Sequence, residues 1–142
     1  MEVSQSVRAY VDAWNRGDLD AMVATFAPDG TYSDPGTPEP VPAHAFKAHM
    51  TGFFAGFPDA TFETVSLHAI TEGPAVWRWV IHGTNTGSYR GLPPTGHTLV
   101  LPGCDFIEVN ADKIQRIDGY FDRLTMLVQL GLAPSQPTGA AT

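Results

Sequence analysis

The stretch "AVWRWVIHGTNTG" (residues 75–87) decides the fold class, because Arg78 and His82 share one parity of position and Trp77 and Trp79 share the other. This period of two is typical of a β-strand, whose successive side chains point to opposite faces. Stretches of the same kind cover residues 61–70, 97–109 and 113–121. "TEGP" and "NADK" are turn sequences between them. We therefore predict a run of antiparallel strands in the second half of the chain.

The third of these strands, "HTLVLPGCDFIEV" (97–109), contains Pro102 and Gly103. Proline cannot donate a ladder hydrogen bond, and glycine often marks irregular strand geometry. We therefore predict a β-bulge at this point, directly before Asp105.

The first half of the chain changes to a helical period. Apolar residues at helical spacing predict a helix over 3–16, which Gly17 ends. Asp18 is a good N-cap for a short second helix that reaches Phe26. The following Pro28 and Gly30 are expected to end that helix.

A Pro-rich loop follows, with a brief strand around Tyr32, and then a third helix over 42–56. A short last helix covers 123–130, with Gly131 just beyond its end. Helices followed by an antiparallel meander predict an α+β fold with the helices packed on one face of the sheet. We expect one domain over 1–132 and a disordered tail over 133–142.

Composition excludes several classes of protein. The chain has 142 residues, a net charge of −7 and only eight Lys and Arg, so neither nucleic acid nor an acidic membrane is an expected partner. No apolar run is long enough to span a bilayer. The single Cys104, together with a start that does not read as a signal peptide, predicts a cytoplasmic protein. Metal-ligand spacings such as H-E-x-x-H do not occur, so no metal site is expected.

Three segments resemble the SnoaL-like polyketide cyclases of the nuclear transport factor 2-like superfamily. They are "VDAWNRGDLDAM" (11–22), "HGTNTGSYRGLPPTG" (82–96) and "YFDRLTMLVQLG" (120–131), and the resemblance spans about residues 5–132. It implies a cone-shaped α+β barrel in which the N-terminal helices pack on a strongly curved, mainly antiparallel sheet that encloses a pocket. It also implies ring closure of a polyketide by aldol chemistry without a metal or cofactor.

The resemblance also assigns the site, with one departure. The acid/base aspartate of these cyclases falls on Gly119, which has no side chain to titrate. Asp105 matches a position of a pocket histidine on the adjacent strand, where facing side chains lie about 5 Å apart. An aspartate among apolar residues has a raised pKa, which suits acid/base work. Asp105 is therefore the expected catalytic carboxylate.

Two further residues are candidates for catalysis. Asp34 matches a family position at the pocket mouth that asparagine usually holds, and its Asp-Pro sequence is equally typical of a turn. His49 shares the apolar stripe of the helix over 42–56 and matches a position that influences stereochemistry in the family. The alternative for His49 is a plain core position.

The remaining candidates are expected to contact substrate. Trp79 and His82 lie on opposite faces of the strand over 75–87, and alternation does not say which face lines the pocket. Asp122 reads first as the N-cap of the last helix and second as a pocket residue, whereas Asp118 should face outward. The full set of predicted substrate-binding residues is Tyr10, Trp14, Tyr32, Phe53, Trp79, His82, Phe121 and Asp122.

Together these features predict a cofactor-independent cyclase or isomerase that acts on an apolar, polyketide-like small molecule in antibiotic or other natural-product biosynthesis. The ring closure could be an aldol reaction, a conjugate addition or a cycloaddition. The alternatives are an epoxide hydrolase, with Arg78 beside Asp105, and a non-catalytic binding module. The strand over 76–82 is hydrophobic on both faces. This predicts a homodimer through the outer face of the sheet.

Overall fold

A computed structural model describes residues 2–70 and 74–134 of the chain. Within the tail expected over 133–142, residues 135–142 lie outside this described part. The elements in chain order are α1 (Gln5–Arg16), α2 (Leu19–Val23), β1 (Phe26–Ser33), β2 (Val41–Pro42), α3 (Ala43–Gly56), β3 (Thr61–Ala69), β4 (Ala75–Thr84), β5 (Thr98–Asn110), β6 (Lys113–Phe121) and α4 (Arg123–Gln129).

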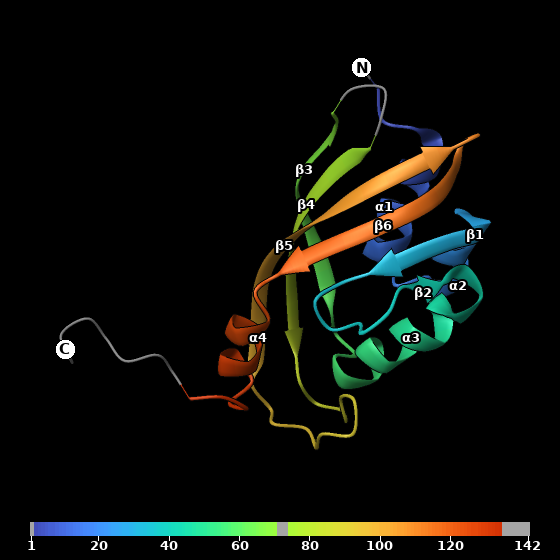
Figure 1. The fold of residues 1–142 in the computed structure, drawn as a ribbon. Coiled ribbons are helices and arrows are strands. Elements are labelled where there is room, and N and C mark those ends of the chain that lie inside the picture. The colour runs from blue at the N-terminus through green and yellow to red at the C-terminus, as the bar shows by residue number, and fades with distance from the viewer. Residues whose placement is uncertain (1, 71–73, 135–142) are drawn as a thin grey trace.

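The strands form one sheet in the order β2-β1-β6-β5-β4-β3. All neighbours pair antiparallel except β1 and β6, which run parallel. Figure 1 shows the long strands β5 and β6 crossing in front of α1, with α2 and α3 to one side and α4 at the end of β6. The predicted α+β class and the four-strand meander are confirmed. The strong curvature expected of the sheet stays a prediction.

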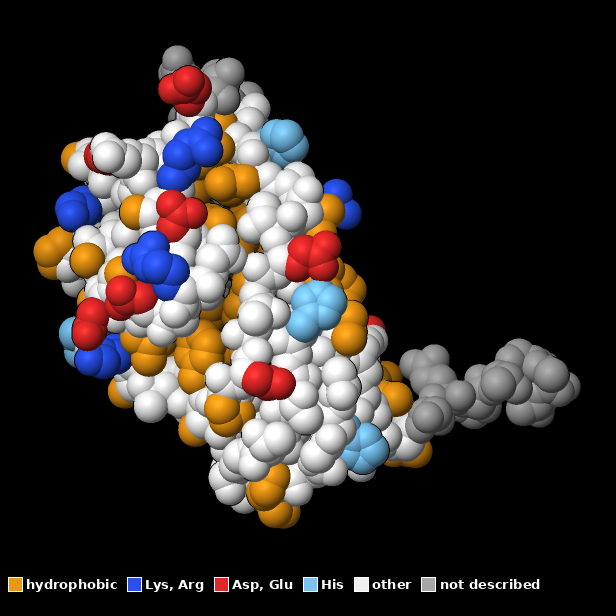
Figure 2. All heavy atoms as spheres, turned by 180° about the vertical axis from the view of Figure 1, so that it is seen from behind, with side chains coloured by type: hydrophobic (Ala, Val, Ile, Leu, Met, Phe, Trp, Pro, Cys, Tyr) orange, Lys and Arg blue, Asp and Glu red, His pale blue; other side chains and the backbone are white. Residues whose placement is uncertain are grey.

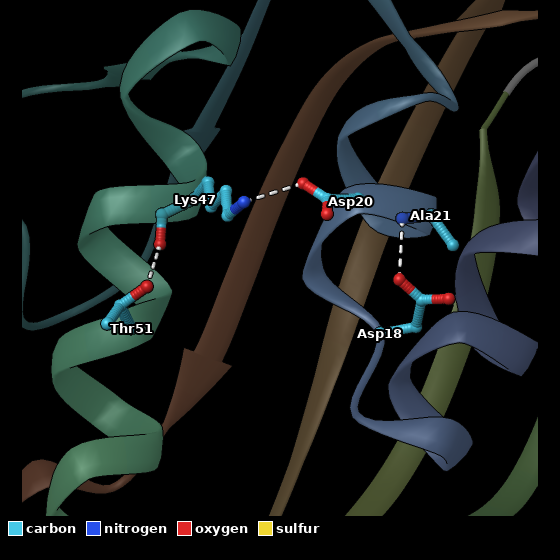
Figure 3. Close-up of polar contacts among 5 residues, drawn as sticks. All are labelled: Asp18, Asp20, Ala21, Lys47 and Thr51. Atoms are coloured by element: carbon cyan, nitrogen blue, oxygen red, sulfur yellow. Dashed lines mark hydrogen bonds and ion pairs between the residues drawn. The ribbon is translucent and has the colours of Figure 1, made fainter.

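The described helices begin and end within two residues of the predicted positions, with one exception. Gly17 ends α1 in a left-handed conformation (φ 65°), and Asp18 accepts a hydrogen bond of 3.0 Å from the Ala21 N–H. Figure 3 shows this cap beside an ion pair of 2.8 Å between Lys47 of α3 and Asp20 of α2, and a bond from the Thr51 hydroxyl to the Lys47 carbonyl. Of these contacts, the exposed ion pair joins α2 to α3.

The exception is the end of the second helix, where the prediction is wrong. α2 ends at Val23, and Phe26 begins β1, a strand of eight residues where only a loop with a brief strand was expected. The pairing of β1 with β6 shifts register between Phe26 and Thr31, so Pro28 lies where the ladder is already irregular. A Cβ on Gly30 would lie 2.7 Å from the Ile114 carbonyl oxygen of β6. Glycine therefore allows this close approach of the two strands.

The predicted bulge at Pro102 and Gly103 is also wrong. The pairing of β5 with β4 runs through both residues without a shift. Pairing of β5 with β6 begins only at Gly103, so β6 does not lie beside Pro102. The proline therefore removes no hydrogen bond between these two strands. A Cβ on Gly103 would collide with the Trp79 ring. The glycine thus makes room for a large pocket side chain rather than bending the strand.

The core lies between the helices and one face of the sheet. β4 directs Trp77, Trp79 and Ile81 to this side, and β5 adds Leu99 and Leu101. The opposite side of β4 carries Arg78 and His82. In Figure 2, charged side chains of both signs are mixed over the visible surface and no patch of a single sign stands out.

Candidate active site

Asp105 is a carboxylate placed inside the apolar core. It lies on β5, paired with Trp77 of β4 on one side and Gly119 of β6 on the other, and only 4% of its surface is exposed. Alternation along β5 puts it on the same face as Leu101 and Ile107. The strand therefore delivers an ionisable group to the side of the sheet that the helices cover.

Gly119 leaves the space that this carboxylate uses. A Cβ built on Gly119 would lie 2.8 Å from Asp105 Oδ1 and 3.6 Å from Asp34 Cβ. Real Cβ atoms do not approach an oxygen so closely, so the Asp105 carboxylate occupies the volume next to the missing side chain. Asp34, at the end of β1, approaches the same point. Two carboxylate residues thus converge where the sheet has no side chain of its own.

The pKa of Asp105 is raised to about 7. Burial is the main cause, because removal from water disfavours the charged form, and the nearby charge of Asp34 adds to it. The indole N–H of Trp79 lies near the carboxylate and opposes the rise, although it has no hydrogen-bond partner among the described residues. Asp105 can therefore both accept and release a proton near neutral pH.

Asp34 is held by a short network at the pocket edge. The buried Tyr32 hydroxyl donates to Asp34 Oδ2 over 2.8 Å, and the Gly36 N–H donates to Oδ1 over 2.6 Å. Burial and the charges of Asp105 and Asp34 raise the pKa of Tyr32 well above its usual value, so it stays protonated as a donor. The Asp-Pro sequence does form a turn here, since the Thr37 N–H bonds to the Asp34 carbonyl. The turn and the pocket position expected of Asp34 occur together.

His49 lies on α3 at the mouth of the pocket, where Arg90 contacts it. Arg90 Nη2 is 3.3 Å from His49 Nε2. A guanidinium only donates, so Nε2 accepts and the neutral ring carries its proton on Nδ1. Partial burial and the Arg90 charge lower the pKa of His49, against a smaller raising effect of Asp34. His49 is therefore an uncharged imidazole at neutral pH.

Aromatic rings make most of the pocket wall. Trp14 packs against Phe62 with ring centroids 4.4 Å apart, and Trp79 lies 5.8 Å from Phe62 and 6.5 Å from Phe121. The pocket holds about 60 Å³ of water-accessible space. The indole N–H groups of Trp14 and Trp79 are buried without a partner among the described residues. The wall thus combines aromatic rings with the few polar groups described above.

The structure places most of the predicted site residues around this one pocket. The predicted residues that line it are Trp14, Tyr32, Asp34, His49, Phe53, Trp79, Asp105 and Phe121.

Three predicted residues lie elsewhere, and these assignments are corrected. Tyr10 is fully buried in the core against Trp77 and Phe26 and does not line the pocket. His82 faces the other side of β4, where its Nε2 lies 2.9 Å from Glu63 Oε1. Asp122 is the N-cap of α4, as its first interpretation held, and accepts from the Leu124 and Thr125 N–H groups over 3.0 and 3.3 Å.

Sequence reasoning missed about half of the wall. Trp77, Ile81 and Leu101 follow by alternation once the inner face of β4 is known, so the signal was present but ambiguous. Arg90 had no such signal, because its place depends on how residues 85–97 fold back over α3. The missed lining residues are Met50, Phe62, Trp77, Ile81, Tyr89, Arg90, Leu101 and Met126.

Comparison with known families decides the membership of the chain. The model of the SnoaL-like polyketide cyclases matches residues 4–130, nearly the whole described part. The chain belongs to this family. In its described residues, no helix is long and apolar enough to cross a membrane, and no group of three or more His, Cys, Asp or Glu side chains is arranged to hold a metal ion.

Solved structures agree with the SnoaL-like fold. IdmH of Streptomyces antibioticus, a proposed polyketide cyclase, is 26% identical with a TM-score of 0.74, over 89% of this chain and 96% of that one. AclR of Streptomyces galilaeus, a proposed hydroxylase, is 24% identical with a TM-score of 0.80, over 96% and 85%. A Catenulispora acidiphila protein with a ketosteroid isomerase-like fold, bound to trimethylamine, is 17% identical with a TM-score of 0.76, over 96% and 100%. Curated proteins give no match.

Proposed function

We propose that this SnoaL-like protein is a cyclase that closes a ring in an apolar, polyketide-like substrate, with Asp105 as its acid/base group. The observation that carries the proposal is the buried Asp105 carboxylate, with a pKa of about 7, in a pocket walled by aromatic rings. A general base works best when its pKa lies near the operating pH. Family membership supports a polyketide-like substrate and a cyclisation reaction.

The chemistry proposed for the site is an intramolecular aldol closure. The ionised Asp105 removes a proton from a carbon next to a substrate carbonyl, and the C–H electron pair becomes an enolate. The enolate carbon attacks a second carbonyl of the same molecule, and a C–C bond forms. Asp105 then returns its proton to the new alkoxide. The stiff aromatic walls favour a folded substrate, so orientation contributes to the acceleration.

Other pocket groups support this step. The indole N–H of Trp79, beside the Asp105 carboxylate, is suited to hydrogen-bond a substrate oxygen, where negative charge develops on the enolate. Asp34 and His49 are proposed to polarise the substrate or relay protons. The neighbouring charge of Asp34 contributes to the near-neutral pKa of Asp105.

The arginine that the epoxide hydrolase alternative requires does not lie in the pocket. That reaction was expected to use Arg78 beside Asp105, but Arg78 is exposed on the opposite face of β4 from Trp77 and Trp79. The convergence of Asp34 and Asp105 alone does not favour this chemistry over cyclisation.

The proposal is tested with Asp105→Asn, which keeps size and hydrogen bonding but removes the proton acceptor. Wild type and variant are incubated in D₂O with a panel of polyketide-like diketones. Mass spectrometry follows both deuterium exchange next to the carbonyls and cyclised product. Acid/base catalysis contributes about 10²–10⁴-fold, so both signals should fall by that factor while ligand binding persists.

Asp118→Asn is the matched control. Asp118 precedes Gly119 on β6 but forms an ion pair of 2.8 Å with Arg116, and it does not line the aromatic pocket. Its substitution should leave exchange and cyclisation unchanged. A drop of less than threefold in Asp105→Asn would instead indicate closure driven by pocket shape. Binding without any turnover in wild type would favour the non-catalytic module.

A further inference from the structure

The loop between β4 and β5 is fastened to the end of α3 by one buried amide. Asn85 is 2% exposed, and its Nδ2 donates to the carbonyls of Gly56 and Gly87 over 3.1 and 2.9 Å. Its Oδ1 accepts from both the N–H and the hydroxyl of Thr95, over 3.0 and 2.9 Å. A fully satisfied buried amide of this kind holds its loop in one geometry.

This loop presses its tip against α3. A Cβ on Gly56 would lie 2.7 Å from Tyr89 Cβ, so only glycine admits the tip at this distance. The next residue, Arg90, has a φ of 49°, a left-handed conformation that a non-glycine residue adopts at an energetic cost. Gly91 follows with a φ of 80°. The arginine at this point is therefore held in a backbone conformation that costs free energy.

The Arg90 side chain is pre-positioned at the pocket mouth. Its guanidinium lies 5.3 Å from the centre of the Tyr89 ring, and its Nε donates to the Tyr89 hydroxyl over 3.1 Å. One Nη2–H donates to His49. Within residues 2–70 and 74–134, no carboxylate lies at ion-pair distance from Arg90. Three of its five N–H donors are left for a ligand.

We propose that Arg90, supported by His49 and Tyr89, binds a carboxylate at the pocket mouth, so that the substrate is an apolar molecule with a free carboxylate at one end. Calling this ligand a substrate rests on the proposed function, and the carboxylate narrows the class of substrate that the pocket accepts. An arginine fork matches the planar, two-oxygen geometry of a carboxylate.

The charges along the pocket give such a ligand one orientation. Arg90 is exposed at the mouth, whereas the buried Asp105 lies at the inner end beside Gly119. Asp34 lies at the pocket edge, close enough for its charge to act on both Asp105 and His49. An anionic group is attracted at the mouth and repelled at the inner end. The neutral carbonyl end of the ligand therefore meets Asp105. Arg90 and Asp105 both line this pocket, so a ligand that reaches from Asp105 to the mouth contacts Arg90.

The test compares 2-naphthoate with its neutral methyl ester, using quenching of tryptophan fluorescence at pH 7.5 and low salt. The pocket contains Trp14, Trp77 and Trp79 as reporters. Wild type should bind the acid about tenfold more tightly than the ester. Arg90→Gln should remove that preference while changing ester affinity less than twofold, and Arg90→Lys should keep part of it. Arg78→Gln, on the other face of β4, is the matched control and should behave as wild type.

Three outcomes would overturn the carboxylate site: equal binding of acid and ester by wild type, equal weakening of both by Arg90→Gln, or no binding of the acid at millimolar concentration. The measurement needs no turnover, so it separates the two proposals. An acid preference that depends on Arg90 in a protein that cyclises nothing refutes only the proposed reaction. Cyclisation without any acid preference refutes only the carboxylate site.

Discussion

At the scale of single residues, the site depends on two positions that face each other across β5 and β6. Asp105 supplies a carboxylate and Gly119 supplies the space for it. The family resemblance puts an acid at 119, and under the proposed function Asp105 supplies that acid from the neighbouring strand, at nearly the same place. A directly opposed antiparallel pair makes this exchange geometrically simple, because both side chains point to the same face.

Gly119→Ala should therefore damage the site without touching a titratable group. The added methyl would lie 2.8 Å from Asp105 Oδ1, so the carboxylate must move. Misplacement of a reacting group by about 1 Å can cost 10²-fold in rate, and we expect a loss of about 10- to 100-fold. Gly52→Ala is the control, since nothing lies within 4 Å of its new Cβ. Full activity of Gly119→Ala would show that the carboxylate does not need this space.

The raised pKa of Asp105 predicts a pH-dependent stability. Between about pH 4 and pH 7 the folded protein holds a proton on Asp105 that the unfolded chain has released. The stability that this proton contributes is complete below about pH 4 and is lost as the pH rises through 7. Urea unfolding from pH 4 to 8.5 should show wild type losing about 4 kcal/mol relative to Asp105→Asn. Parallel curves for the two proteins would contradict the buried carboxyl.

At the scale of elements, α4 is a short helix that closes the chain against β5. Met126 and Leu130 are buried, and the Gln129 amide both donates to the Val100 carbonyl and accepts from the Val100 N–H, over 2.9 and 2.8 Å. A helix this short is only marginally stable by itself. Its N-cap and these tertiary hydrogen bonds therefore decide whether it forms. Met126 also lines the pocket.

Asp122→Ala should lower stability and leave the chemistry intact. Asp122 accepts two backbone N–H bonds of α4 and a 2.8 Å bond from the Thr125 hydroxyl, and these bonds lower its pKa. Loss of an N-cap should reduce the melting temperature by about 2–4 °C in calorimetry. Glu39→Ala, at another exposed acid, should melt like wild type. If the variant melts at the wild-type temperature but loses turnover, Asp122 acts in the active site and not only as a helix cap.

At the scale of the whole molecule, the outer face of the sheet exposes large apolar side chains among polar ones such as Arg78 and His82. Val100, Phe106 and Tyr120 are 46%, 37% and 55% exposed, and the last two rings pack edge to face at 5.9 Å. Exposed apolar area of this kind marks contact surfaces. A homodimer through this face is therefore still the expected state.

Sedimentation at micromolar concentration should give about twice 15.3 kDa. Phe106→Lys should shift the protein to a monomer, because it places a charge in the apolar contact. Leu92→Lys, at an apolar residue exposed in the loop before β5, should stay dimeric. A wild-type monomer at these concentrations would refute the interface.

The sequence by itself determined the features that depend on local spacing. The period of two located β3 to β6, the helical period located α1 and α3, and Asp18 and Asp122 identified helix starts. Neighbours in sequence impose these patterns, so no distant contact is needed to predict them. The family resemblance added Asp105, because it carried a known strand register onto this chain.

Only the tertiary structure decided the rest. β1 contains Pro28 and Gly30 and reads as a loop, yet it pairs in parallel with the distant β6, whose backbone supplies its hydrogen bonds. The sequence did not determine which face of β4 points inward, because both faces are partly apolar. In the structure, the face with Trp77 and Trp79 packs against the helices, and His82 lies on the other face. Arg90 reaches the pocket through the fold of a whole loop. In each case the deciding contact joins residues far apart in the chain, and local sequence carries no record of that contact.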